Sequence, residues 1–157
     1  MMIEQIIKDR KFKNLMEAHA KAVIEYLLSK QITFSILCNV GLVEFNPPLP
    51  ESITSSFRPL TLFVLAGYTF ESIELDHHNL YFEAGFGAQN LGSFVTVPLY
   101  SILQIILQDS NNIQDSTLFV NLTAGNDSFE VNLEDEEGVK SSMEALLSNP
   151  ENQRFKK

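Results

Sequence analysis

Glu74, Asp76, His77 and His78 form the group of side chains best suited to chemistry in this sequence. Two adjacent imidazoles with nearby carboxylates are ligands that a transition metal accepts. Neighbouring residues on a strand point to opposite faces of the sheet, so His77 and His78 diverge unless a turn re-aims them. Asp-His-His-Asn between two apolar runs is also typical of a hairpin turn. We therefore predict a polar turn with no metal or other cofactor. A metal-binding or small-molecule site is the alternative interpretation.

The other candidate catalytic residues lack partners in the sequence. Cys38 lies in an apolar run without a neighbouring basic residue to lower its pKa, which predicts a buried structural thiol. Gly85-Phe86-Gly87 is not followed by the Lys or helix N-terminus of a phosphate-binding loop. His19 has no second ligand at helical spacing, and no Ser or Cys lies in a nucleophile elbow or beside an evident base. We therefore expect a protein that is not an enzyme.

Charge is distributed unevenly along the 157 residues, whose formal net charge is −9. Residues 31–126 contain one basic residue, Arg58, against eight acids. Nucleic-acid affinity comes mainly from neutralising several phosphates, which one cation cannot do. The same charge disfavours a strongly acidic peptide as ligand, because like charges repel. We therefore expect no nucleic acid among the partners.

Length and composition predict one globular domain in a reducing compartment. The hydrophobic fraction of 45% supports a buried core, and the single Cys excludes a disulfide framework within the chain. The first residues contain no long apolar stretch before a small-residue cleavage site, so no signal peptide is expected. The apolar runs at 60–68 and 99–107 are too short to span a bilayer. We therefore predict a cytoplasmic protein without membrane contact.

Residues 70–98 organise the predicted sheet. Residues 73–75 alternate with polar neighbours as in a half-buried strand, and 80–86 form a second strand after the polar turn. Residues 93–97 form a third strand, which Pro98 ends. Three strands joined by short turns make a meander, and a small barrel or a curled sheet is the natural way to close it.

Two more strands are predicted before the meander. Residues 32–40 form an apolar, β-branched strand, and 60–66 form a continuous apolar strand in the centre of the sheet. The four prolines within 41–59 indicate a long loop or an edge segment between them.

A helix over 14–29 is predicted to pack on this sheet, after a short amphipathic helix within 2–12. Asn14 is the expected N-cap, with Glu17 at the capping-box position. The helix carries two adjacent apolar rows, namely Leu15, Ala18, Ala22 and Tyr26 in one and Met16, Ala20, Val23 and Leu27 in the other. This stripe is wide for one small sheet to cover. Either the whole stripe packs on the sheet or part of it makes a subunit contact.

The C-terminal third adds further predicted elements. Apolar residues at helical spacing favour a short helix over 99–108. Alternation in 117–123 and in 128–133, around a Gly-Asn-Asp turn, predicts a hairpin. Residues 139–147 form the apolar side of a short helix, and 150–157 are expected to be a flexible tail.

Three short stretches follow one another along the chain, namely Tyr26-Leu27-Leu28-Ser29-Lys30-Gln31-Ile32-Thr33, Phe82-Glu83-Ala84-Gly85-Phe86-Gly87-Ala88 and Val95-Thr96-Val97-Pro98-Leu99. Their order and near-constant spacing resemble the SspB (stringent starvation protein B) family over about residues 22–108. The first stretch is similar to the junction between the family's N-terminal helix and first strand. The second falls on its Phe-Asn-Ala-Arg-Phe-Gly-Gly stretch, and the third matches its Val-Ser-Val-Pro-Leu.

The resemblance implies an α+β, mainly β fold. Its N-terminal helix packs on a small Sm-like β-barrel or curled antiparallel sheet, with an added C-terminal hairpin and short helix. A single domain over 1–149 would contain the helix 14–29, the barrel at about 32–133 and the helix 139–147. Residues 150–157 would follow as a flexible tail. The family is usually dimeric through the N-terminal helix, so a homodimer is expected.

The resemblance also implies a function as a peptide-binding adaptor. The family holds degradation tags in an extended groove, and a flexible tail docks on the unfoldase ClpX to deliver cargo to the ClpXP protease. The groove would lie along the strands 60–66 and 80–86, and its candidate contact residues are Phe63, Leu65, Tyr81, Glu83, Gly85 and Phe86. The candidate docking motif in the tail consists of Arg154, Phe155, Lys156 and Lys157.

Two departures from the family pattern bear on the cargo. Glu83 and Gly85 stand where the family has Asn and Arg, so a groove cation is lost and an acid is gained. The family's long acidic linker is replaced by the predicted hairpin and helix. The sequence therefore leaves open an adaptor of changed specificity and a homo-oligomeric interaction module without a protease role, in which the helix 139–147 docks a different partner.

Overall fold

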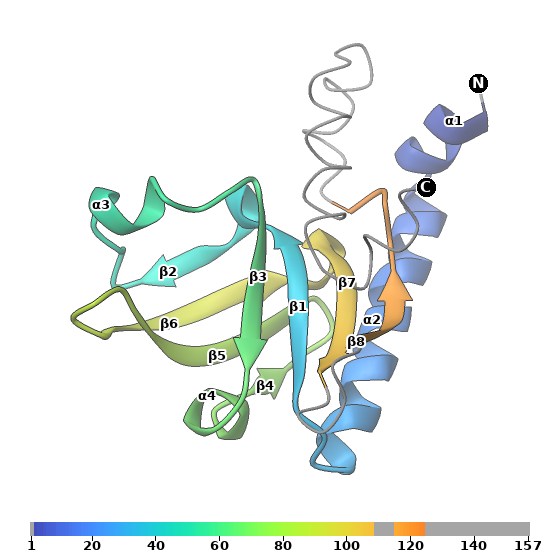
Figure 1. Cartoon of the computed structure of the whole chain (residues 1–157). Coiled ribbons are helices and arrows are strands. Elements are labelled where there is room, and N and C mark those ends of the chain that lie inside the picture. Colours follow the sequence, from blue (N-terminus) through green and yellow to red (C-terminus); the bar gives the residue numbers. More distant parts are fainter. Residues whose placement is uncertain (1, 109–114, 125–157) are drawn as a thin grey trace.

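The computed structural model describes residues 2–108 and 115–124, which form two antiparallel sheets and an N-terminal helical arm (Figure 1). The helices are α1 (Met2–Lys8), α2 (Arg10–Ser29), α3 (Glu51–Thr54) and α4 (Tyr68–Glu71), with 3-10 turns η1 (Val40–Leu42) and η2 (Leu99–Ser101). The strands are β1 (Phe34–Asn39), β2 (Glu44–Asn46), β3 (Leu60–Leu65), β4 (Glu74–Leu75), β5 (Asn79–Phe86), β6 (Leu91–Pro98), β7 (Ile102–Gln108) and β8 (Asp115–Val120).

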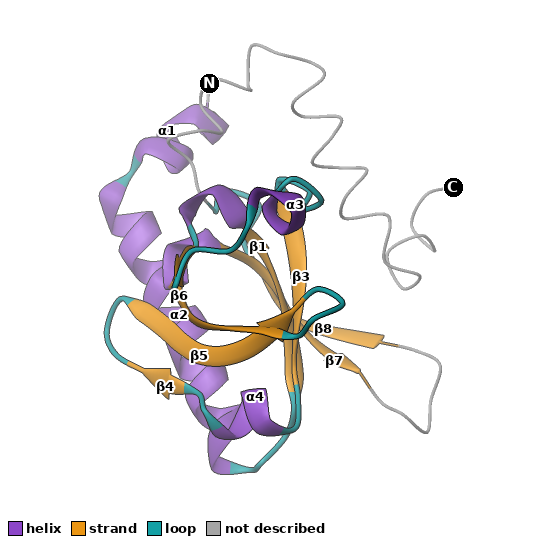
Figure 2. Ribbon diagram, turned by 90° about the vertical axis from the view of Figure 1, so that its left-hand side faces the viewer, coloured by secondary structure: helices purple, strands orange, loops and turns teal. Residues whose placement is uncertain are grey.

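The strands divide into two four-stranded sheets. Sheet A has the order β3-β1-β7-β8 and sheet B has the order β2-β6-β5-β4, and all pairings are antiparallel. The α+β class and the β4-β5-β6 meander are therefore confirmed. The described strands do not join into one closed barrel. Figure 2 shows α3 and α4 at opposite ends of the sheets.

Helix α2 begins four residues before the predicted start. Asp9, rather than Asn14, is the N-cap, and its side chain accepts a hydrogen bond from the Lys11 N–H at 2.8 Å. A carboxylate that satisfies a free N–H of the first turn fixes a helix start, so Asn14 lies inside the helix. The helix ends at Ser29, and Gln31 takes a positive φ of 57° as the chain turns into β1.

The two apolar rows of α2 have different environments. Ala20, Ile24 and Leu27 are buried in the core beside η2 and β8. The first predicted row is exposed along its whole length, at Leu15, Ala18, Ala22 and Tyr26. The fold therefore uses one row for its own core and leaves the other at the surface.

The core fills the space between α2 and the two sheets. Its largest fully buried side chains include Phe82 on β5, Ile24 on α2 and Ile36 on β1. Cys38 on β1 is buried as predicted, and burial raises the pKa of its thiol, which opposes formation of a nucleophilic thiolate. Within residues 2–108 and 115–124, no helix combines the length and apolar character needed to cross a membrane.

The predicted helix over 99–108 is wrong. Only Leu99–Ser101 forms a helical turn, and Ile102–Gln108 is strand β7, paired with β1 on one side and β8 on the other. Residues 102–106 are all buried, so both faces of this strand are covered. A continuous apolar run fits helical and strand spacing equally well, and β-branched isoleucines on a central strand decide between them.

The predicted central position of residues 60–66 is also wrong, because β3 lies at an end of sheet A. Its side chains alternate, with Leu62 and Val64 exposed and Phe63 and Leu65 buried. The run is continuous in hydrophobicity because the exposed positions of β3, Leu62 and Val64, are themselves apolar. These two exposed residues explain why the sequence resembles a strand buried on both sides.

The C-terminal predictions are described only in part. Residues 115–120 form β8, which pairs with β7, and residues 121–124 form a turn that stays against sheet A, where the Asn121 N–H donates to the Leu103 C=O at 2.6 Å. The second hairpin arm 128–133, the helix 139–147 and the tail 150–157 lie outside the described residues.

Candidate peptide-binding groove

A surface hollow of about 490 Å³ lies where the end of β3 and helix α4 approach β5 and β6. Ala66 and Tyr68 line one side, and Glu83 and Gly85 line the other. The ends of the two strands that were predicted to hold a ligand therefore share one groove. Asn90 and Phe94 also line this hollow.

The predicted contact residues occupy different positions around this groove. Glu83 and Gly85 line it directly, and Tyr81 lies two residues along β5 on the same face. Leu65 is fully buried and Phe63 nearly so, and their side chains fill the core. Phe86 packs edge-on against Phe45 and Phe63 in an aromatic cluster between the sheets. None of these three apolar side chains lines the groove.

The β5 edge is open at Gly85. The Glu83 N–H donates to Ser72 Oγ at 2.8 Å, rather than to β6, so α4 covers the edge at that point. Along a strand of an antiparallel sheet, every second residue directs its backbone N–H and C=O to the same neighbouring side. Glu83 directs its N–H away from β6, so Gly85, two residues further along, directs its backbone polar groups to the same free edge, beside the groove. An added strand can pair with the protein there.

Glycine at position 85 permits a close approach of Asn90. A Cβ placed on Gly85 would collide with the side-chain amide of Asn90, which folds back from the β5–β6 turn with a φ of 51°. A larger side chain at this position would displace the amide. The small residue therefore keeps the groove open and lined by Asn90 rather than by a long side chain.

Glu83 is held by a tyrosine on α4. The Tyr68 hydroxyl donates to Glu83 Oε2 at 3.2 Å. The negative charge of Glu83, reinforced by this hydrogen bond, raises the pKa of Tyr68. Both side chains are exposed, so this pair presents an acid and an aromatic ring to the groove.

The histidine cluster forms the predicted polar turn between β4 and β5. Asp76 Oδ1 accepts hydrogen bonds from the backbone N–H of His78 at 2.9 Å and of Asn79 at 2.8 Å. The rings of His77 and His78 lie 6.5 Å apart, and His78 Nδ1 lies 3.3 Å from Glu17 Oε1 on α2. Among the described residues, no three His, Cys, Asp or Glu side chains are grouped to hold a metal ion.

The pKa of Asp76 is expected to lie well below that of an ordinary carboxyl group. Tyr81, which donates to Asp76 Oδ2 at 2.6 Å, and the two backbone N–H groups lower the pKa of Asp76 from 3.8 to about 2. Because the folded-state pKa is the lower one, Asp76 stabilises the fold above about pH 4, and this contribution is lost as the pH falls toward 2.

A carboxyl-detected NMR titration checks this prediction. Tyr81→Phe removes the hydrogen bond that contributes most to the lowered pKa, so the Asp76 pKa should move upward toward 3.8. Tyr68→Phe is the control, since its hydroxyl contacts Glu83 instead. An Asp76 carboxyl that titrates near 3.8 in the unaltered protein would contradict the turn geometry.

Sequence reasoning missed Tyr68, Asn90 and Phe94. Tyr68 and Asn90 stand outside any predicted strand, and they reach the groove through α4 and the β5–β6 turn. Phe94 belonged to a predicted strand, and its alternation with the buried Ser93 and Val95 was the available signal that it faces outward. The candidate tail residues 154–157 lie outside the described residues.

No model of a known protein family and no curated protein matches this chain.

Proposed function

We propose that this protein is a non-enzymatic, peptide-binding adaptor of the SspB type that presents its cargo to the ClpXP protease in the cytoplasm. The observation that carries the proposal is the groove beside the open edge of β5 at Gly85. An extended peptide would gain affinity by pairing its backbone with this edge and selectivity from the side chains that line the groove.

The order of elements supports this assignment. An N-terminal helix is followed by strands that form two curled antiparallel sheets around one core, and the stretches that resemble the family lie at the helix end and on β5 and β6. We interpret this arrangement as an open form of a small Sm-like barrel. On this interpretation the groove opens where β3 and β5 leave the barrel unclosed.

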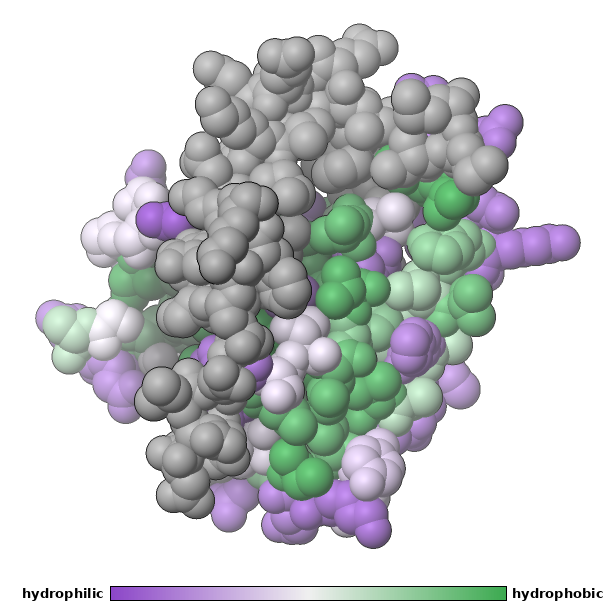
Figure 3. All heavy atoms as spheres, turned by 45° about the vertical axis from the view of Figure 1, so that its right-hand side comes forward, coloured by the Kyte–Doolittle hydropathy of each residue, from purple (hydrophilic) through white to green (hydrophobic). Residues whose placement is uncertain are grey.

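A homodimer is the assembly that the exposed surface favours. The exposed row of α2 contains Leu15 and Tyr26, which are 61% and 58% exposed. Leu118 and Val120 of the neighbouring strand β8, and Leu122 in the turn after it, are further exposed apolar side chains. Figure 3 shows a patch of apolar surface on the side of the molecule that carries α2 and β8. Contiguous apolar surface of this kind marks a protein contact.

The tail is assigned to ClpX docking. Arg154, Phe155, Lys156 and Lys157 combine basic and apolar side chains as the family's docking motif does. Deletion of residues 151–157 should abolish ClpX association and leave peptide binding unchanged. The measurement is an affinity pull-down from bacterial lysate with the intact and the shortened chain, with circular dichroism to show that both are folded.

The outcomes of this pull-down separate the two functions. ClpX that remains bound after the deletion would show that residues 151–157 are not the docking site. Absence of ClpX from both samples, with another partner retained by both, favours the second candidate, a homo-oligomeric interaction module. The observation that favours this second candidate is the apolar surface over α2 and β8, which is exposed and lies apart from the residues that line the groove.

A further inference from the structure

The outer face of sheet B gathers acidic side chains around an aromatic pair. In the β5–β6 register Glu83 lies beside Phe94 and Tyr81 lies beside Thr96. The neighbouring strands extend this row, because Glu74 on β4 pairs with Tyr81 and Glu44 on β2 pairs with Thr96. Directly paired residues share a face of the sheet, so three exposed carboxylates stand on the face that carries Tyr81 and Phe94.

The aromatic side chains form a platform beside Glu83. The rings of Tyr81 and Phe94 stack with centroids 5.8 Å apart and an interplanar angle of 23°. Phe94 is 39% exposed and Tyr68 is 66% exposed, and both line the groove together with Glu83. An exposed aromatic face attracts an ammonium or guanidinium group, and a carboxylate at its rim adds an ion pair.

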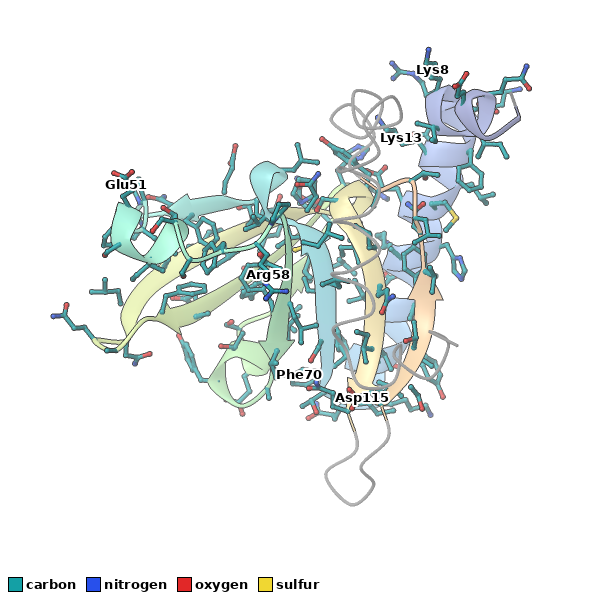
Figure 4. The ribbon with its side chains drawn as sticks, turned by 45° about the horizontal axis from the view of Figure 1, so that its top comes forward. Lys8, Lys13, Glu51, Arg58, Phe70 and Asp115 are labelled. Atoms are coloured by element: carbon teal, nitrogen blue, oxygen red, sulfur yellow. The ribbon has the colours of Figure 1, made fainter. Side chains whose placement is uncertain are left out.

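Basic side chains are nearly absent from this part of the molecule. Between residues 31 and 124, Arg58 is the single Lys or Arg among the described residues. It lies in the connection from α3 to β3 (Figure 4), beside a separate hollow that Leu37, Phe57 and Leu62 line. Sheet B itself contains no Lys or Arg in its described strands. The field at the groove is therefore negative, which attracts cationic ligands and repels acidic ones.

We propose that the occupant of the groove is an extended peptide that carries a lysine or arginine, whose cation binds between Glu83 and the rings of Tyr68 and Phe94. This inference rests on the proposed peptide-binding function and specifies its substrate class. Backbone pairing at Gly85 holds the peptide, and Glu83 selects the charge of one of its side chains.

A peptide-library experiment tests the inference. The full chain is immobilised and incubated with pools of short capped peptides that are random at all positions but one, where Lys, Arg, Ala or Glu is fixed. The Lys and Arg pools should be enriched about tenfold over the Glu pool, which corresponds to about 1.4 kcal/mol. Glu83→Gln should reduce this ratio toward one, and Glu83→Lys should invert it.

Asp115→Lys is the matched control, since it makes the same change of charge on β8 of sheet A (Figure 4), at the opposite end of that sheet from β3. It should leave the ratio unchanged. Retention of peptides without a preference for a cation, or with a preference for Glu, overturns the inference and leaves peptide binding intact. Retention of no pool at all overturns the proposed function itself.

Discussion

Replacement of Phe82 by alanine is expected to lower the free energy of unfolding by about 3–5 kcal/mol. Phe82 is fully buried at the centre of β5, and its ring contacts Phe63 of sheet A at a centroid distance of 5.9 Å. The substitution removes this contact between the sheets and leaves a cavity that the surrounding strands cannot fill. Urea denaturation followed by circular dichroism measures the loss.

Phe94→Ala is the matched control, because Phe94 lies on the paired strand with 39% of its surface exposed. This substitution should lower the free energy of unfolding by about 1 kcal/mol or less. A loss below about 1 kcal/mol for Phe82→Ala would contradict a core shared by the two sheets.

The double substitution Leu15→Glu and Tyr26→Glu is expected to raise the dissociation constant of the proposed homodimer by about several hundredfold, because two interface hot spots each contribute about 2 kcal/mol or more. Both residues lie on the exposed row of α2, so the monomer fold should be unchanged. Analytical ultracentrifugation should give twice the 17.7 kDa of one chain for the unaltered protein and the monomer mass for the variant.

Leu62→Glu provides the comparison for this experiment. Leu62 is 40% exposed on β3, at the opposite end of sheet A from β8, so the same kind of charge is introduced away from α2. This variant should remain dimeric. An unaltered protein that sediments as a monomer, or a double variant that stays dimeric, would exclude α2 as the dimer interface.

Local patterns were sufficient to predict much of this fold. The β4-β5-β6 meander follows from alternating side chains and from turn formers such as Asp76, whose carboxylate caps its own turn. Burial of Cys38 and one row of α2 follows from uniform apolar runs and helical spacing. These features depend on neighbouring residues in the sequence, so the sequence contains their signal.

The errors lie where distant strands decide the structure. Residues 102–108 become β7 because β1 and β8 flank them, and their own spacing does not contain that information. Likewise, β3 lies at an end of sheet A although its composition resembles that of a central strand. Pairing between distant segments determines both positions.

In the candidate site too, features set by neighbouring residues were predictable and features set by distant segments were not. Glu83 and Gly85 were found through the resemblance of their strand to a known family, and both line the groove. Leu65 is fully buried although it was predicted to contact the ligand, because the sequence of a continuous apolar strand does not indicate which of its residues face the core. Tyr68 reaches Glu83 from another element, so no spacing rule relates the two residues.

Hydrogen exchange on the full chain, with and without saturating cargo peptide from the pull-down, tests most directly whether the peptide pairs with the open edge of β5. Peptide that pairs with the β5 edge should slow exchange at the Gly85 amide and at neighbouring groove residues such as Ala66 and Asn90. Exchange in α2 and on the outer face of sheet A should be unchanged. Protection confined to α2 and β8, with the groove amides unaffected, would contradict peptide binding at the β5 edge and place the binding site elsewhere on the molecule.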